Sequence, residues 1–120
     1  MATLATAARN AAADAVAALL NNGTIVFNTA GGSEVATCAF GATAFASAVT
    51  GVATANSITP DSSATGGTVA SVLLKTSAPA TLITCTATVT GGGGDFTAST
   101  LTIGAGDTVA VSSLTITQPA

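Results

Sequence analysis

The sequence predicts a mainly β domain: an antiparallel β-sandwich of about seven strands, immunoglobulin-like or jelly-roll in type, preceded by one N-terminal α-helix. Two patterns lead to this prediction. The first twenty residues repeat small and apolar side chains at helical spacing. After Gly23 the spacing changes to two, in short runs separated by Gly, Ser, Asn and Pro. The 120 residues fit a single domain, residues 1–120, with the helix at 3–21 and the sandwich at 24–118.

The segment 3–21 predicts a helix because it is rich in alanine, the best helix former, and holds neither Gly nor Pro. We expect Thr3 to cap its N-terminus, and Gly23 to end it in the left-handed conformation. Asn10 and Asp14 are expected to face away from the protein. The apolar stripe expected to face it consists of Leu4, Ala8, Ala11, Ala12, Ala15, Val16, Leu19 and Leu20.

The predicted strands are bounded by turn-forming residues. The clearest alternation lies at 81–90, where one face carries Ile83, Cys85, Ala87 and Val89 and the other carries threonines. The strands are expected at 24–28, 34–40, 43–50, 52–58 (a weak one), 68–76, 81–90, 96–103 and 108–118.

The last two predicted strands carry two finer expectations. The tripeptide Leu-Thr-Ile occurs at 101–103 and again at 114–116, and we expect these segments to be two arms of one hairpin. In the last strand the apolar positions change parity at Ser112 and Ser113, which predicts a bulge that re-aims the side chains.

Composition and charge exclude several classes of function. There are 28 alanines and 23 threonines but only seven charged residues, and the net charge is −3. Two basic residues cannot neutralise a phosphate backbone, which excludes electrostatic nucleic-acid binding and disfavours anionic membranes. A surface so poor in charge resists self-association weakly, so we expect a subunit that packs among neighbours, as a homo-oligomer.

No residue pattern predicts catalysis, a cofactor or a metal. The chain has no His, Tyr or Trp, which removes histidine bases, histidine ligands and tyrosine nucleophiles. The carboxylates near predicted turns, Asp95 and Asp107 above all, are expected to stabilise those turns. The glycine run 91–94 matches no phosphate-binding motif and predicts a flexible tip.

The cysteines and phenylalanines have simple structural interpretations. Cys38 and Cys85 are expected to be two buried free thiols, since cytoplasmic synthesis is expected. Cytoplasmic synthesis is expected because the first twenty residues contain no convincing secretory signal. Their apolar run is also too short to span a bilayer. Three phenylalanines fall in or near predicted strands and are expected in the core: Phe27, Phe40 and Phe45.

Residues that could contact a neighbouring subunit fall in two places. Methyl groups bury little area each but let backbones come close, so the N-terminal half of the helix is a candidate interface while Leu19 and Leu20 pack on the sandwich. Phe96, next to the glycine run, is the ring expected to reach a neighbour. The candidate interface residues are therefore Leu4, Ala8, Ala11, Ala12 and Phe96.

Three segments lie in a set order along the chain: Ala8-Arg9-Asn10 leading to Leu19-Leu20-Asn21-Asn22-Gly23-Thr24, then Ala44-Phe45 with Gly51-Val52-Ala53-Thr54-Ala55-Asn56, and last Ile103-Gly104-Ala105-Gly106-Asp107-Thr108-Val109 with Leu114-Thr115-Ile116. In order and spacing they resemble a family of small proteins encoded in the structural gene clusters of tailed bacteriophages and prophages. The resemblance spans most of the chain and implies a structural protein located in the virion.

Within that class we expect a capsid decoration or cement protein that binds the head surface in many copies. Its partners would be the major capsid protein or other virion subunits. The alternative is a tail-tube, neck or baseplate component, because the resemblance does not separate head from tail. A hypothesis of another class, a secreted adhesive or ligand-binding β-module, is limited by the missing signal and by the absence of Tyr and Trp platforms for sugars.

Overall fold

The computed structural model describes residues 5–78, 80–89, 91–98 and 100–117, and its helix comes first in the chain. The elements are α1 (Thr6–Ala18), β1 (Thr24–Asn28), β2 (Glu34–Phe40), β3 (Val52–Thr54), β4 (Ile58–Thr59), β5 (Gly67–Thr68), β6 (Ser71–Lys75), β7 (Thr81–Val89), β8 (Phe96–Ala98), β9 (Thr102–Ile103) and β10 (Thr115–Thr117).

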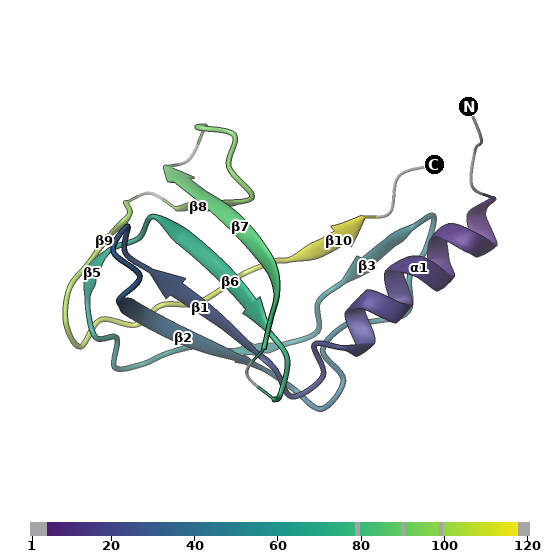
Figure 1. The fold of residues 1–120 in the computed structure, drawn as a ribbon, viewed down its shortest axis with the longest axis horizontal. Coiled ribbons are helices and arrows are strands. Elements are labelled where there is room, and N and C mark those ends of the chain that lie inside the picture. The colour runs from purple at the N-terminus through teal and green to yellow at the C-terminus, as the bar shows by residue number, and fades with distance from the viewer. Residues whose placement is uncertain (1–4, 79, 90, 99, 118–120) are drawn as a thin grey trace.

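Most strands belong to one six-stranded sheet in the order β4-β2-β1-β6-β7-β8. Neighbouring strands in it are antiparallel except β7 and β8, which run parallel. Two small sheets, β10-β3 and β5-β9, complete the fold. Figure 1 shows the large sheet as a curled layer, with α1, β3 and β10 together at one end of the molecule and β5 and β9 at the other.

The mainly β class with an N-terminal helix is therefore confirmed. The finer expectation of an immunoglobulin-like or jelly-roll sandwich is not, because only two-stranded sheets accompany the six-stranded one in the described part of the chain. The strands with the strongest alternation agree best with the prediction. β1 and β2 have the predicted bounds, and β7 ends within one residue of them.

Several strand predictions are wrong. The predicted strand 96–103 is divided into β8 and β9, which belong to different sheets, and within 108–117 only β10 forms a strand. The segment 43–50 forms no named strand and makes only isolated bridges, Phe45 with Ala55 and Val49 with Val52. Its many alanines favour a strand weakly. The two Leu-Thr-Ile segments are not arms of one hairpin, because β9 pairs with β5 and β10 pairs with β3.

The expected parity change in the last segment is present. The half-buried residues are first the odd-numbered Val109 and Val111 and then the even-numbered Leu114 and Ile116, and the residues between them are exposed. No bulge in a paired strand accounts for it among the described residues. Instead Val109 bridges Asp61, after which the chain passes on to pair with β3.

The helix is shorter than predicted and ends differently. It begins after Ala5 without a side-chain cap, and Thr3 lies outside the described residues. At its end Leu19, Leu20 and Asn21 donate their N–H groups to carbonyls three residues back. The left-handed residue is Asn22, with φ 59°, and not Gly23.

Gly23 is required for space and not for its φ angle. A Cβ placed on it would lie 2.1 Å from the carbonyl oxygen of Lys75, the residue at the end of β6. The backbone of Gly23 is thus packed directly against the sheet, and it fixes where the chain leaves the helix.

The face of α1 that packs on the protein is not the predicted stripe. Its buried residues are Ala13 and Ala17, with Leu20 just beyond, whereas Ala8, Ala11 and Ala15 are exposed and Leu19 is 55% exposed. The expectation that Leu19 packs on the sheet is therefore wrong, while that for Leu20 is confirmed.

The expectation that Asn10 and Asp14 face away is also wrong. The Gly51 N–H donates to Asn10 Oδ1 and the Ala48 N–H to Asp14 Oδ1, both at 2.7 Å. Arg9 Nη2 donates to the Thr50 carbonyl at 2.9 Å. The helix turns its polar side inward because the tight turn at 48–51 has backbone groups that need partners.

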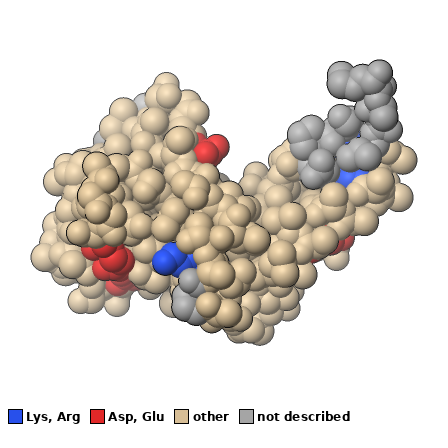
Figure 2. Space-filling view, in the orientation of Figure 1, with Lys and Arg blue, Asp and Glu red and all other residues tan. Residues whose placement is uncertain are grey.

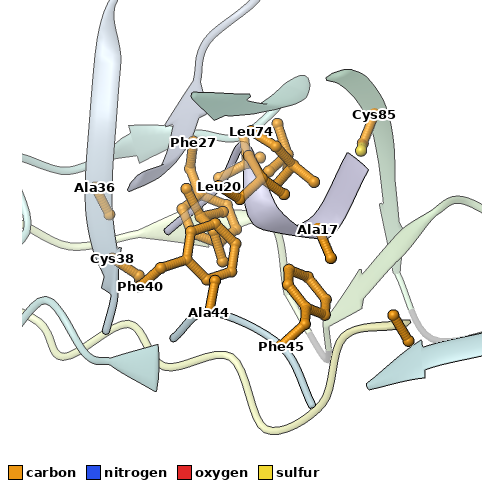
Figure 3. Packing of buried hydrophobic residues seen from close by; sticks show 14 of the residues in the cluster. Ala17, Leu20, Phe27, Ala36, Cys38, Phe40, Ala44, Phe45, Leu74 and Cys85 are labelled. Atoms are coloured by element: carbon orange, nitrogen blue, oxygen red, sulfur yellow. The ribbon is translucent and has the colours of Figure 1, made fainter. Parts of the chain in front are cut away.

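The core lies between the large sheet, the end of the helix and the 44–53 segment. Figure 3 shows Leu20, Phe27, Phe40 and Leu74 converging there, with Phe45 beside Ala17. The Phe40 and Phe45 ring centroids are 5.5 Å apart. The prediction that Phe27, Phe40 and Phe45 are core residues is confirmed, with exposures of 8%, 5% and 6%.

Candidate functional site

The main concave feature is a groove over the inner face of the large sheet. It consists of two hollows, of ≈ 260 Å³ and ≈ 440 Å³, that share Asp95 and Phe96 in their lining. The floor is made by sheet residues, and below we call the two hollows together the groove. Its floor residues are Phe27, Ala36, Leu74, Ile83, Cys85 and Ala87.

The groove has two walls. One is formed by β8 with residues 100–103. The other is the segment 109–117, which we call the C-terminal segment. Its residues Val109 to Ser113 line the first hollow, and Leu114 to Thr117 line the second. The C-terminal segment leaves apolar side chains partly open to the groove, because four of them are only half-buried: Val109, Val111, Leu114 and Ile116.

Phe96 lies in this groove because β8 runs parallel beside β7. Its ring meets Phe27 edge-on, with centroids 6.0 Å apart and an interplanar angle of 81°. The prediction that Phe96 reaches a neighbour remains a prediction. The structure shows it half-buried against Phe27, at the point common to both hollows.

The glycine run 91–94 and Asp95 hold β8 in place. The Gly94 N–H donates to Thr88 Oγ1 at 3.0 Å, and a Cβ on Gly92 would lie 2.7 Å from the Thr88 side chain. Asp95 Oδ2 accepts from the Thr86 N–H at 3.0 Å, and the Asp95 N–H donates to Thr86 Oγ1 at 3.0 Å. Glycines here allow the loop to pack closely on β7, which positions Phe96.

Every carboxylate accepts a hydrogen bond. Asp107 accepts from the Gly104 N–H at 2.9 Å, which is the turn-stabilising role expected of it. Asp95, at the end of the glycine loop, accepts from the Thr86 N–H and so ties the loop to β7. Glu34 accepts from the hydroxyls of Thr37 and Thr65. Among the described residues no cluster of three or more His, Cys, Asp or Glu could hold a metal ion.

Asp61 is the carboxylate whose pKa is lowered. The Thr37 N–H donates to its Oδ2 and the Ser63 N–H to its Oδ1, both at 2.9 Å, and these two bonds favour the charged form. Asp61 also bridges Val109 through backbone hydrogen bonds. It therefore joins β2 to the start of the C-terminal segment.

Cys38 and Cys85 are free and buried, as expected. Burial raises the pKa of both thiols. A backbone hydrogen bond from Asp61 opposes this increase for Cys38, and the negative charge of Asp95 adds to it for Cys85. The Cys38 thiol donates to the Val109 carbonyl at 3.3 Å. Their positions indicate packing and not reactivity.

The helix residues of the candidate interface form a separate surface. Leu4 lies outside the described residues, Ala8 and Ala11 are exposed, and Ala12 is half-buried. None of the described ones lines the groove that contains Phe96. Of the predicted interface residues, Phe96 therefore lies in the groove. The sequence signal for the other groove residues is the parity change at Ser112 and Ser113.

No helix in the described part of the chain is long and apolar enough to cross a membrane. In comparisons with known proteins, no family model, curated protein or solved structure matches the chain. Its function is therefore inferred from its own residues.

Proposed function

We propose that the protein is a structural subunit of a tailed-bacteriophage virion, and that it acts as a capsid decoration or cement protein that binds the head surface in many copies. The observation that supports this best is a groove with an apolar floor, left open on a molecule with only seven charged residues. A groove of this kind is typical of a binding surface, and a charge-poor exterior favours association.

The rest of the surface supports a role in assembly. Figure 2 shows one face of the molecule on which acidic and basic side chains are few and separated. Among the residues that the structure describes, three large hydrophobic ones are more than half exposed: Leu19 at 55%, Val49 at 71% and Val89 at 51%. Together with the exposed alanines of α1, they give neighbouring subunits several weakly polar surfaces to contact.

The hydrogen bonding of the carboxylates also favours a structural role over catalysis. The five acids are occupied with backbone N–H groups and threonine hydroxyls. Glu34 and Asp61 both accept from Thr37, but neither lines the groove, where acid–base catalysis by two carboxylates would need them.

The phage setting rests on the resemblance of the three sequence segments. A small domain rich in hydroxyls suits repeated attachment to a finished shell, with the major capsid protein or other virion subunits as partners. A tail-tube, neck or baseplate position is the alternative within the same proposal.

The test is to locate the chain in purified particles of the phage that encodes it. Mass spectrometry of gradient-purified virions should detect it in many copies, and a cryo-electron microscopy map should show density for it on the head surface. Density in the tail would support the alternative. Absence of the chain from virions would contradict the proposal.

A further inference from the structure

Two strand edges without a partner border the groove. β8 ends the order of the large sheet and pairs with β7 alone, and β10 pairs with β3 alone, within the part of the chain that the structure describes. A strand edge presents a row of N–H and C=O groups, which readily pair with another extended chain.

Consecutive residues of both strands line the groove. Side chains of a strand alternate between its two faces, so a hollow that touches only one face is lined by every second residue. The hollows are instead lined by consecutive residues, Phe96 to Ala98 on one side and Leu114 to Thr117 on the other. Consecutive lining indicates that each strand meets the groove along its edge.

The hydrogen bonds of β10 identify which backbone groups are available. The Ala55 N–H donates to the Leu114 carbonyl at 2.8 Å, so Leu114 points its backbone groups toward β3. Because these directions alternate along an antiparallel strand, Ile116 also points to β3, and Thr115 and Thr117 point away from it. The N–H and C=O groups of Thr115 and Thr117 thus face the groove.

The floor of the groove specifies the chemistry of an occupant. It offers aliphatic and aromatic groups, among them Leu74, Ile83 and Phe96. Asp95 is the one charged residue in either lining, and its carboxylate already accepts from the N–H and hydroxyl of Thr86. An occupant that complements this groove is uncharged and places an aliphatic side chain on the floor at every second position.

We propose that the groove receives an extended segment of a neighbouring subunit, which adds a β-strand along the edge of β10 with aliphatic side chains on the floor and small polar ones outward. This rests on the proposed function, since it names the kind of contact by which the protein binds its virion partner. The donor is a different protein and not a second copy. In the described part of this chain the longer strands β1, β2, β6 and β7 are already hydrogen-bonded members of the large sheet, so none of them is free to enter the groove as a single extended segment.

The test uses the full chain and a labelled synthetic peptide of alternating Thr and Val, with a Gly-Lys-Lys tail for solubility. Fluorescence anisotropy should show saturable binding, and a peptide with Pro in place of its central Val should not bind. Thr115→Pro removes one groove-facing N–H and should weaken binding about tenfold. Thr115→Val keeps that N–H and should bind like the wild type.

Hydrogen exchange on the wild-type protein gives a second measurement in case Thr115→Pro fails to fold. Addition of the peptide should slow exchange of the Thr115 and Thr117 amides. Unchanged exchange, or equal binding by the proline peptide, would overturn the proposal. A dimer of the chain alone that Thr115→Pro abolishes would overturn it in favour of a second copy. Each of these results leaves the virion location untouched, which only the particle experiment tests.

Discussion

Asp14 accepts a hydrogen bond of 2.7 Å from the backbone N–H of Ala48, a residue 34 positions away in the sequence. The bond ties the middle of α1 to the tight turn at 48–51, where Thr50 has a φ of 52°, an uncommon conformation for a β-branched residue. Asn10 and Arg9 bond to the same turn. The polar side of the helix thus holds a strained turn in place.

We predict that Asp14→Ala destabilises the domain by about 1–2 kcal/mol, because the partly buried Ala48 N–H loses its acceptor. Thermal unfolding followed by circular dichroism measures the loss as a decrease in Tm. Asp14→Asn keeps an oxygen acceptor at the same position and should lose less. Equal stability of Asp14→Ala and the wild type would show that the bond contributes nothing.

We predict that Gly23→Ala costs about 3 kcal/mol or prevents folding, because its Cβ would lie 2.1 Å from the Lys75 carbonyl oxygen and backbone must move. The matched control is Gly41→Ala, where a Cβ would meet nothing within 4 Å. Urea unfolding of the two variants compares them directly. A Gly23→Ala protein as stable as Gly41→Ala would contradict the close packing of Gly23 on the Lys75 carbonyl.

We predict that Cys38 and Cys85 react slowly with thiol reagents in the folded protein, since both are buried and their raised pKa values reduce the thiolate fraction at neutral pH. In denaturant without reductant, both thiols of each chain should titrate rapidly. Reductant should leave Tm unchanged. Fewer than two reactive thiols after unfolding would reveal a disulfide and contradict the prediction.

We predict that Asp61 contributes to stability at neutral pH and not in acid. Its folded-state pKa is lowered by the Thr37 and Ser63 N–H groups, so the unfolded chain takes up this proton first. The contribution is fully present above the ordinary Asp pKa near 3.8 and is lost as pH falls through the lower folded value. The Tm difference between the wild type and Asp61→Asn should therefore be largest at neutral pH and shrink below pH 3.8. A difference that stays constant with pH would be inconsistent with this.

The local patterns of the sequence predicted the elements of the fold well where alternation was strong. β1, β2 and β7 combine β-branched residues with a period of two, and these properties are local. Pairing partners were predicted less well, as with β9 and β10. Which strands pair depends on contacts between segments far apart, and two identical tripeptides carry no information on that.

The orientation of α1 could not be predicted from hydropathy. Alanines lie on both of its sides, and the expected apolar stripe, which includes Val16, Leu19 and Leu20, left Asn10 and Asp14 on the outer side. The structure places them inward because backbone groups of the 48–51 turn need acceptors, and nothing in the helix sequence reveals that turn. The groove escaped prediction for a similar reason, since it depends on which edges of β8 and β10 are left unpaired.

Because the side of α1 that carries Asn10 and Asp14 faces the protein, the predicted interface residues Ala8 and Ala11 lie on the outer surface. An assembly contact can be tested there without disturbing the core. We predict that Ala11→Lys leaves the domain folded, because a lysine there reaches solvent, but abolishes assembly on the particle. Ala12→Glu should act in the same direction with some loss of stability, since Ala12 is half-buried. The control is Ala13→Lys: Ala13 is 1% exposed, and an ammonium group buried there should unfold the domain.

Circular dichroism melting tests folding, and co-sedimentation with particles that lack the wild-type protein tests assembly. Anisotropy with the alternating peptide should be unaffected by Ala11→Lys, because Ala11 does not line the groove. If Ala11→Lys sediments with particles as the wild type does, the N-terminal half of α1 is not an assembly surface.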